Sequence, residues 1–142
     1  MTEPNVRTGG CLCGAVRFSV PLDALHFSAC HCAMCRRWGG GPMLAVDATA
    51  PVTWQGEDAI GRYRSSERAE RCFCKHCGTS LFYYSIKKGQ TVLNLGAFDD
   101  QDDFTMESQI FIDEKPPGYS FANETPTLTA ADVYALYAAD PS

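Results

Sequence analysis

Eight cysteines fall into three tight clusters in the first half of this chain. The clusters read Cys11-Leu-Cys13, Cys30-His-Cys32-Ala-Met-Cys35 and Cys72-Phe-Cys74-Lys-His-Cys77. Cysteines one residue apart are poorly placed to bridge each other. In an extended strand, however, alternate side chains share a face, so such a pair can present two sulfurs to one ion. The spacing therefore favours metal binding over a disulfide framework, with partners drawn from different clusters.

The compartment expected from the sequence favours the same interpretation. The first residues, Met-Thr-Glu-Pro-Asn, do not have the charged start and apolar stretch of a secretory signal. No run approaches the roughly 18 apolar residues that a membrane-spanning helix needs. We therefore expect a cytoplasmic protein with reduced thiols, in which clustered cysteines indicate metal binding or catalysis. Soft thiolate ligands favour zinc, with iron at a four-sulfur site as the alternative.

Length and charge narrow the functional classes. A chain of 142 residues is expected to form a single domain over residues 1–142. The 12 glycines and 8 prolines predict many turns, and loop-rich domains often depend on a metal for stability. A formal net charge of −5 disfavours binding to the phosphate backbone of nucleic acids. The local basic pair Arg36-Arg37, directly after a cysteine cluster, suits a small anionic ligand better than a polymer.

The pattern of apolar residues predicts a mainly β protein. Residues 15–20 alternate between apolar and polar side chains, which is the period of a half-buried strand. Further short strands are predicted at residues 43–46, 60–63, 81–84, 91–95 and 109–112, separated by turn residues.

One helix is predicted near the end of the chain, over residues 130–139. Thr129 precedes it, Asp132 is its acidic partner in the first turn, and Pro141 follows its end. We expect Val133, Leu136 and Tyr137 to form its packing face.

Eight sulfurs permit two tetrahedral metal sites, but the spacing alone leaves open which cysteines share an ion. A structural zinc site has four protein ligands, and a catalytic site has three with one open position. One division joins Cys11 and Cys13 to the Cys74-x-x-Cys77 turn. Cys30, Cys32 and Cys35 would then hold a second ion with a vacancy.

The cysteine clusters and their flanks resemble one known family. The matching segments are Gly9-Gly-Cys-Leu-Cys-Gly-Ala-Val-Arg-Phe18, Cys30-His-Cys-Ala-Met-Cys-Arg36, Tyr63-Arg-Ser-Ser66 and Arg71-Cys-Phe-Cys-Lys-His-Cys-Gly78. They are similar to the glutathione-dependent formaldehyde-activating enzyme family, which includes centromere protein V, over about residues 7–120. The resemblance implies a mainly antiparallel β architecture with the two metals near one end. With the helix predicted above, we expect antiparallel β-sheets stapled by zinc and a short C-terminal helix.

The resemblance also implies how the cysteines divide. Cys11, Cys13, Cys74 and Cys77 match the family's structural zinc ligands, and Cys30, Cys32 and Cys35 match the three ligands of its second, catalytic zinc. Cys72 departs from the family's seven-cysteine pattern. We interpret it as a core thiol rather than a ligand, although a regular strand would point it to the same side as Cys74.

Basic and hydroxyl side chains near the clusters are candidates to hold the carboxylates of a thiol peptide. They are Arg36, Arg37, Arg64, Ser65 and Ser66. A guanidinium makes a bidentate match to a carboxylate, which a lysine does not. The alternative for each of these charges is a solvated surface position. Trp38 and glycines 39–41 could form a pocket wall or an ordinary turn.

The three histidines are expected to serve the structure. On a strand, the ring of His31 would face away from a metal held by its cysteine neighbours, and we interpret it as a hydrogen-bonded structural residue rather than a proton shuttle. His76 is expected to face solvent, and His26 to lie in the core.

Three functions remain open at the level of sequence. The resemblance implies a carbon-sulfur lyase-like enzyme that condenses glutathione with formaldehyde. The alternatives are a non-enzymatic zinc-stabilised binding module and a redox sensor that releases zinc when its thiols are oxidised. Small thiol and aldehyde substrates are the expected partners, with no nucleic acid and no membrane.

Overall fold

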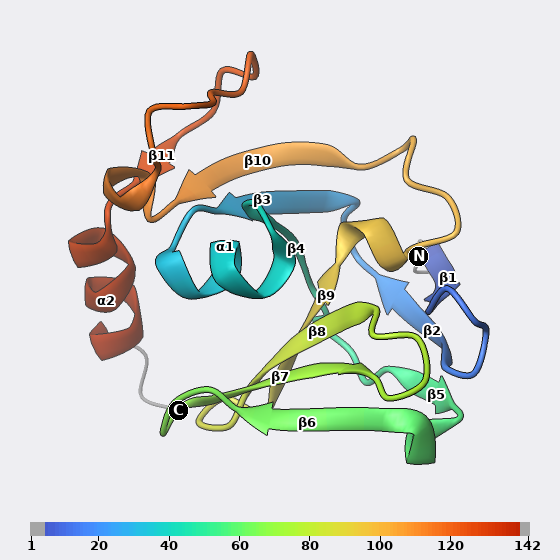
Figure 1. Ribbon diagram of the computed structural model, residues 1–142. Helices are drawn as coiled ribbons and strands as arrows, with labels where there is room; N and C mark the ends of the chain where they lie inside the picture. Colours follow the sequence, from blue (N-terminus) through green and yellow to red (C-terminus); the bar gives the residue numbers. More distant parts are fainter. Residues whose placement is uncertain (1–4, 140–142) are drawn as a thin grey trace. The chain divides into compact units, whose positions relative to one another are not determined.

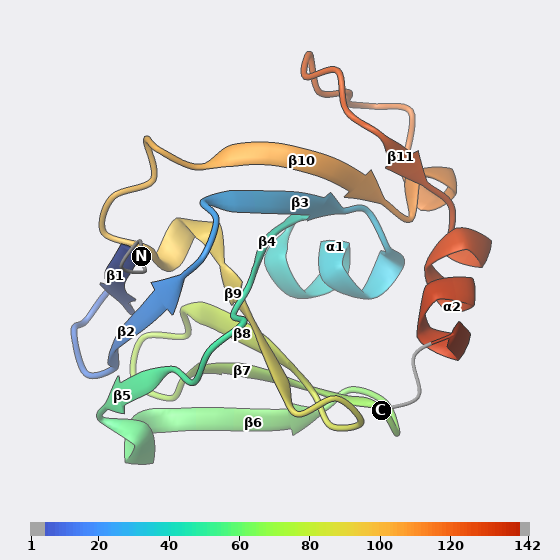
Figure 2. The same ribbon diagram turned by 180° about the vertical axis from the view of Figure 1, so that it is seen from behind.

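The computed structural model describes residues 5–139, and the side chains of residues 5–136. The chain forms two compact units that interleave along the sequence. The first comprises residues 1–25 and 46–104, and the second comprises residues 26–45 and 105–142. The elements of both units are labelled in Figure 1 and can be followed from behind in Figure 2.

The first unit is built from antiparallel strands. A three-stranded sheet has the order β1-β2-β5, and a further run has the order β9-β8-β7-β6. The strands are β1 (Asn5–Gly10), β2 (Arg17–Leu22), β5 (Thr53–Gln55), β6 (Ile60–Arg64), β7 (Ala69–Cys74), β8 (Ser80–Ser85) and β9 (Gln90–Asn94). Two short 3-10 helices, η1 (Glu57–Ala59) and η2 (Leu95–Ala97), precede β6 and follow β9.

Aromatic side chains form the core of this unit. The ring centroid of Phe18 lies 5.5 Å from that of Trp54 and 5.2 Å from that of Phe98. Trp54 in turn stacks 4.8 Å from Phe82, which is fully buried. These are the separations at which aromatic pairs attract one another beyond their burial alone. The core therefore joins strands from both sheets of the unit.

The second unit combines a mixed sheet with two helices. Strand β3 (His26–Cys30) pairs antiparallel with β4 (Met43–Asp47), while β10 (Thr105–Ile110) pairs parallel with both β3 and β11 (Thr127–Leu128). Helix α1 (Ala33–Gly39) follows directly from β3, and α2 (Ala130–Ala139) follows β11, as Figure 1 shows. A 3-10 turn, η3 (Ile112–Glu114), leaves the end of β10.

The prediction of a mainly β, mainly antiparallel fold is confirmed. Strand β10 adds two parallel pairs, with β3 and with β11. The structure also contains a second helix, α1, where the sequence predicted only one. The prediction of a single domain over residues 1–142 stays a prediction.

The helix predicted at residues 130–139 is present with its predicted cap. The Thr129 backbone N–H donates to the Asp132 carboxylate at 2.9 Å, and the Asp132 N–H donates to the Thr129 hydroxyl at 3.1 Å. Val133 is buried, as expected, but Leu136 is 61% exposed, so the predicted packing face is wrong at that residue. The side chain of Tyr137 lies outside the described residues. No helix within residues 5–139 is long and apolar enough to cross a membrane.

Candidate metal centres and a basic cleft

Four cysteines of the first unit converge on one point. The Sγ atoms of Cys11, Cys13, Cys74 and Cys77 all lie within 4.8 Å of one another. The Sγ of Cys13 is 3.6 Å from that of Cys11 and 3.8 Å from that of Cys74. Four sulfurs at about 2.3 Å from a tetrahedral zinc would be about 3.8 Å apart. The donor set and its spacing therefore fit zinc.

Two turns bring these sulfurs together. The first is a tight turn after β1, closed by a hydrogen bond from the Gly14 N–H to the Cys11 carbonyl at 3.2 Å. The strand geometry expected for Cys11 and Cys13 is therefore wrong, since both lie outside a strand. The second turn follows β7, where the Gly78 N–H donates to the Cys74 carbonyl at 2.8 Å. Gly78 has φ +79°, a left-handed conformation that suits glycine at the close of such a turn.

Thr79 links the two turns, and nothing in the cysteine pattern pointed to it. Its hydroxyl accepts a hydrogen bond from the Leu12 N–H at 3.1 Å and lies 3.2 Å from the Cys77 Sγ. Hydrogen bonds from the Thr79 hydroxyl and backbone lower the pKa of Cys77 to about 5. The backbone N–H groups of Val16 and His76 donate to the sulfurs of Cys11 and Cys74 at 3.3 and 3.4 Å. Such donors stabilise thiolates, which are the form that binds metal.

Three cysteines of the second unit form a separate cluster. Cys30 ends β3, Cys32 caps the N-terminus of α1 by accepting from the Cys35 N–H at 3.3 Å, and Cys35 is buried in the helix. Their Sγ atoms lie within 4.8 Å of one another, with 3.4 Å between Cys30 and Cys35. This donor set fits a zinc with three protein ligands and one open position.

The thiols of the second cluster resist ionisation unless a cation lies beside them. Hydrogen bonds to the sulfurs of Cys32 and Cys35, together with burial, raise the pKa of Cys30 far above its usual range. Packed thiols resist ionisation because the charges would repel one another in a poorly solvated place. A divalent cation reverses that balance, since a coordinating thiol is deprotonated.

Cys72 belongs to neither cluster, as the sequence predicted. It is fully buried on β7, and burial raises its pKa to about 11, so it is a neutral thiol. Its Sγ accepts a hydrogen bond from the Arg62 Nη1 at 3.6 Å, whereas Cys74, two residues on, joins the four-cysteine cluster.

His31 is a buried structural residue with a partner for every polar group. Its Nδ1 lies 2.9 Å from the Tyr119 hydroxyl, and its Nε2 lies 2.9 Å from the Gln109 Oε1. Its backbone N–H donates to the Ile110 carbonyl at 3.1 Å, and its carbonyl accepts from the Arg36 Nε at 3.0 Å. The segment between two candidate ligands is thus fixed from β10, from α1 and from the loop that carries Tyr119.

The other two histidines are exposed. His76 faces solvent, as expected. The expectation that His26 lies in the core is wrong, because its ring is exposed and its Nδ1 lies 3.1 Å from the Glu107 carboxylate.

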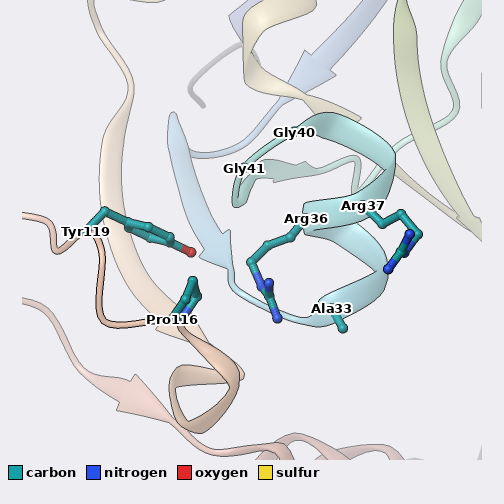
Figure 3. Close-up of a pocket in the computed structure, with 7 residues that line it drawn as sticks. All are labelled: Ala33, Arg36, Arg37, Gly40, Gly41, Pro116 and Tyr119. Atoms are coloured by element: carbon teal, nitrogen blue, oxygen red, sulfur yellow. The ribbon is translucent and has the colours of Figure 1, made fainter.

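A cleft of about 480 Å³ lies beside the three-cysteine cluster in the second unit. Its lining is Ala33, Arg36, Arg37, Gly40, Gly41, Pro116 and Tyr119. Figure 3 shows Arg36 on the side of α1 that faces Tyr119 and Pro116, while Arg37 extends on the other side. Gly40, with φ +85°, ends α1 and turns the chain along the cleft. Glycines 40 and 41 are therefore both a helix end and a cleft wall.

The loop after β10 supplies the opposite wall, which the sequence analysis did not identify. Glu114 accepts a hydrogen bond from the Ala33 N–H at 3.1 Å and so ties the loop to the start of α1. The Lys115 ammonium donates to the Tyr119 carbonyl and to the Ser120 hydroxyl, and lies 5.1 Å from the ring centroid of Tyr119. These contacts set the position of the Tyr119 ring.

The remaining predicted contact residues lie in the first unit. Arg64, Ser65 and Ser66 follow one another at the turn between β6 and β7. The Arg64 guanidinium donates to the carbonyls of Ser66 and Glu67 at 3.2 and 2.9 Å, so it holds the turn itself. Their role in ligand binding stays a prediction.

The fold and the two clusters define a small, mainly β protein with cysteine sites suited to zinc. Residues 6–114 match the family described as glutathione-dependent formaldehyde-activating enzyme, so the chain belongs to that family. An "Uncharacterized lyase" of Schizosaccharomyces pombe is 36% identical over 126 residues, covering 88% of this chain and 92% of the relative.

Two further relatives are more distant. A Halomonas elongata protein, provisionally named a glutathione-dependent formaldehyde-activating enzyme, is 27% identical over 103 residues, covering 66% of each chain. A Rhodobacter sphaeroides protein of known crystal structure shares the fold with a TM-score of 0.56 at 21% identity, covering 84% of this chain and 98% of its own.

Proposed function

We propose that this protein is a zinc-dependent, carbon-sulfur lyase-like enzyme that condenses a small thiol such as glutathione with formaldehyde or a related aldehyde. The observation that carries the proposal is a cluster of three cysteine sulfurs beside a basic cleft. Family membership supports the same reaction class. The four-cysteine cluster would hold a structural zinc, and Cys30, Cys32 and Cys35 a second, exchangeable zinc. Free thiols, as found in the cytoplasm, are required for both.

The reaction needs a thiolate and a place for the charge that forms on the aldehyde oxygen. A zinc held by three thiolates would lower the pKa of a thiol that enters its open position. The thiolate sulfur then forms a bond to the carbonyl carbon, the carbonyl π pair moves to oxygen, and that oxygen takes a proton from water. Cys30, Cys32 and Cys35 would bind the ion, and the four bonds of His31 hold that segment in place.

Substrate binding falls to the basic residues. The bond of Arg36 to the His31 carbonyl uses only Nε, so with respect to the described residues its terminal nitrogens are available to a ligand. Within the described residues, no carboxylate forms an ion pair with Arg36 or Arg37. We assign Arg36 as the principal carboxylate contact, with Arg37, Arg64, Ser65 and Ser66 as further candidates.

The test compares zinc-loaded wild type with a ligand variant and a matched cysteine control. Thiols add to formaldehyde without a catalyst, so the quantity to measure is the rate of exchange between ¹³C-formaldehyde and its glutathione adduct at equilibrium, by NMR. Wild type should accelerate exchange above the rate with no protein. Cys32→Ser should abolish the acceleration and lose one equivalent of zinc while the fold remains.

Cys72→Ser is the control, since Cys72 is a neutral buried thiol outside both clusters. It should keep both zinc ions and the exchange rate. If wild type with both sites filled gives no acceleration with glutathione or another small thiol, the enzyme proposal is wrong and a zinc-stabilised binding module becomes the better interpretation.

A further inference from the structure

Tyr119 stands at the end of a chain of hydrogen bonds that runs through the second unit. The Gln109 Nε2 lies 3.5 Å from the Thr125 hydroxyl, and the Gln109 Oε1 lies 2.9 Å from the His31 Nε2. The His31 Nδ1 lies 2.9 Å from the Tyr119 hydroxyl, which lines the basic cleft. Gln109 is 7% exposed and His31 is fully buried, so both depend on these partners.

The donor and acceptor groups of these residues fix the direction of every hydrogen bond in the network. The Thr125 hydroxyl donates to the Pro126 carbonyl at 3.1 Å and therefore accepts from the Gln109 amide N–H. The Gln109 Oε1 can only accept, so His31 donates from Nε2. A neutral imidazole has one donor and one acceptor nitrogen, which makes Nδ1 the acceptor. Tyr119 therefore donates its hydroxyl proton to His31.

This direction leaves the Tyr119 oxygen as a hydrogen-bond acceptor. A phenol hydroxyl that donates one hydrogen bond still has lone pairs on its oxygen that can accept another. Among the residues that the structure describes, none donates to that oxygen. Burial raises the pKa of Tyr119, which keeps the phenol protonated, and the nearby charge of Arg36 opposes part of that rise.

Arg36 places a complementary donor in the same cleft. Its Nε bond to the His31 carbonyl orients the guanidinium, and Figure 3 shows the side chain on the Tyr119 side of α1. His31 thus positions both cleft residues, Tyr119 through its ring and Arg36 through its carbonyl. The cleft presents a cationic fork for an oxyanion and, beside it, an acceptor for a donor group.

We propose that Tyr119 is a specificity residue, accepting a hydrogen bond from an N–H group adjacent to a carboxylate that Arg36 holds. This rests on the proposed function, because it names the part of the thiol substrate that the cleft recognises. The ligand class is an amino-acid or peptide terminus, and a simple carboxylic acid would leave the Tyr119 oxygen without a partner. Glutathione offers two such termini, the γ-glutamyl ammonium group and the amide N–H of its glycine, each next to a carboxylate.

The test uses a probe that cannot bind through sulfur. In γ-glutamyl-2-aminobutyryl-glycine a methyl group replaces the thiol, so calorimetry of this tripeptide with the zinc-loaded protein reports only recognition of its termini. One analogue has glutaryl in place of γ-glutamyl and lacks the ammonium group. The other has N-methylglycine in place of glycine and lacks the amide N–H.

Tyr119→Phe should weaken binding of the parent tripeptide about fivefold, the scale of one neutral hydrogen bond. The same substitution should have no effect on one of the two analogues, and that analogue identifies the terminus in the cleft. Tyr134→Phe is the matched control, because Tyr134 is 54% exposed on α2 and outside the cleft lining. Zinc content and melting temperature should be unchanged in both variants.

A second variant tests the direction of the hydrogen bonds between Gln109, His31 and Tyr119. Gln109→Met removes the acceptor for the His31 Nε2, which favours the other tautomer and turns the Tyr119 hydroxyl into a donor toward the cleft. It should weaken the parent tripeptide to a similar extent while Tyr119 is still present. An unchanged affinity in this variant would show that these hydrogen bonds do not orient the Tyr119 hydroxyl.

Equal weakening of all three tripeptides by Tyr119→Phe, no weakening at all, or failure of the parent to bind wild type would each overturn the inference. The exchange measurement with formaldehyde separates this from the proposed function. Tyr119-dependent binding without accelerated exchange would leave the recognition intact and remove the enzyme. Accelerated exchange with no effect of Tyr119→Phe on binding would support the enzyme and overturn the role of Tyr119 in recognition.

Discussion

The two cysteine clusters differ in how they are built. The first joins ligands from two turns that are 61 residues apart at Cys13 and Cys74, and it has four sulfurs. The second takes three sulfurs from one short segment, Cys30 to Cys35. A site that ties distant segments together contributes to the fold, whereas a site made within one segment can lose its ion without releasing the chain. The structure thus separates a four-cysteine cluster that joins distant segments from a three-cysteine cluster within one segment.

Three arginines of the first unit and the two arginines of the cleft differ in their partners. In the first unit Arg7, Arg17 and Arg62 each lie within 3.3 Å of a carboxylate. In the second unit no described carboxylate pairs with Arg36 or Arg37, which line a cleft. Charges that already have a partner stabilise their surroundings. Arg36 and Arg37 have no such partner among the described residues, which is why we propose them as ligand contacts.

The largest expected effect is loss of the closed site. Cys74→Ser removes a buried ligand that joins β7 to the turn after β1. Structural zinc contributes on the order of 10 kcal/mol to folding in small domains, so the variant should be largely unfolded by circular dichroism and zinc analysis. Cys72→Ser, two residues away, should melt cooperatively with full zinc. A folded Cys74→Ser protein that retained all its zinc would show that the two clusters are not different in kind.

Removal of metal should occur in two separate steps. A chelator titration of the zinc-loaded protein should first take one equivalent, with no change in the far-ultraviolet circular dichroism, because the three-cysteine cluster has one fewer protein ligand. The second equivalent should leave together with unfolding. Loss of both ions in one step, with unfolding, would mean that the second cluster is also structural.

The sequence predicted the parts of this comparison that depend on ligand type and spacing. The division of seven cysteines into a group of four and a group of three followed from the Cys-x-Cys and Cys-x-x-Cys patterns together with the family resemblance. The start of helix α2 was also predicted from the sequence, since Thr129 and Asp132 cap it with reciprocal hydrogen bonds. Local signals of this kind do not depend on the rest of the fold.

Other features depend on tertiary structure and had no local signal. Helix α1 is only seven residues long, and its N-cap is Cys32, a residue rarely associated with capping. Cys74 belongs to the four-cysteine cluster and Cys72, two residues before it on β7, does not, a difference that strand alternation does not predict. Tyr119 lies in a loop more than 80 residues from the cluster it adjoins, and its bond to His31 and the contacts of Lys115 hold it at the site.

The difference between the two arginines of the cleft can be measured directly. Arg36→Ala should weaken glutathione binding by about 1.5 to 3 kcal/mol, the scale of a charged hydrogen bond to a carboxylate. Arg37→Ala should change it by about 1 kcal/mol or less, because Arg37 is exposed and extends on the other side of α1. Calorimetry at constant zinc loading is the measurement. Equal effects of the two substitutions would remove the distinction that Figure 3 suggests.

The smallest effect concerns an arginine that already has its partner. Asp99 accepts from the Arg17 Nη1 at 2.9 Å and from the Thr8 hydroxyl at 2.7 Å, and these bonds, with that of Arg17 the stronger, lower its pKa to about 2. A carboxyl with a lowered folded-state pKa contributes stability that is present above its unfolded value, about 3.9, and is lost as the pH falls toward 2.

Because both side chains are close to half exposed, solvent screening limits the contribution to about 1 kcal/mol or less. Asp99→Asn should therefore destabilise the zinc-loaded protein by that amount in urea, equally at pH 5 and pH 8. The control is Asp103→Asn, since the Asp103 side chain is 62% exposed and makes one bond to Arg7, and its effect should be smaller. A difference between wild type and Asp99→Asn that changed between pH 5 and pH 8 would show that Asp99 titrates in that range and that Arg17 does not hold it ionised. Arg17 would then lack the ionised partner that Arg7 and Arg62 have.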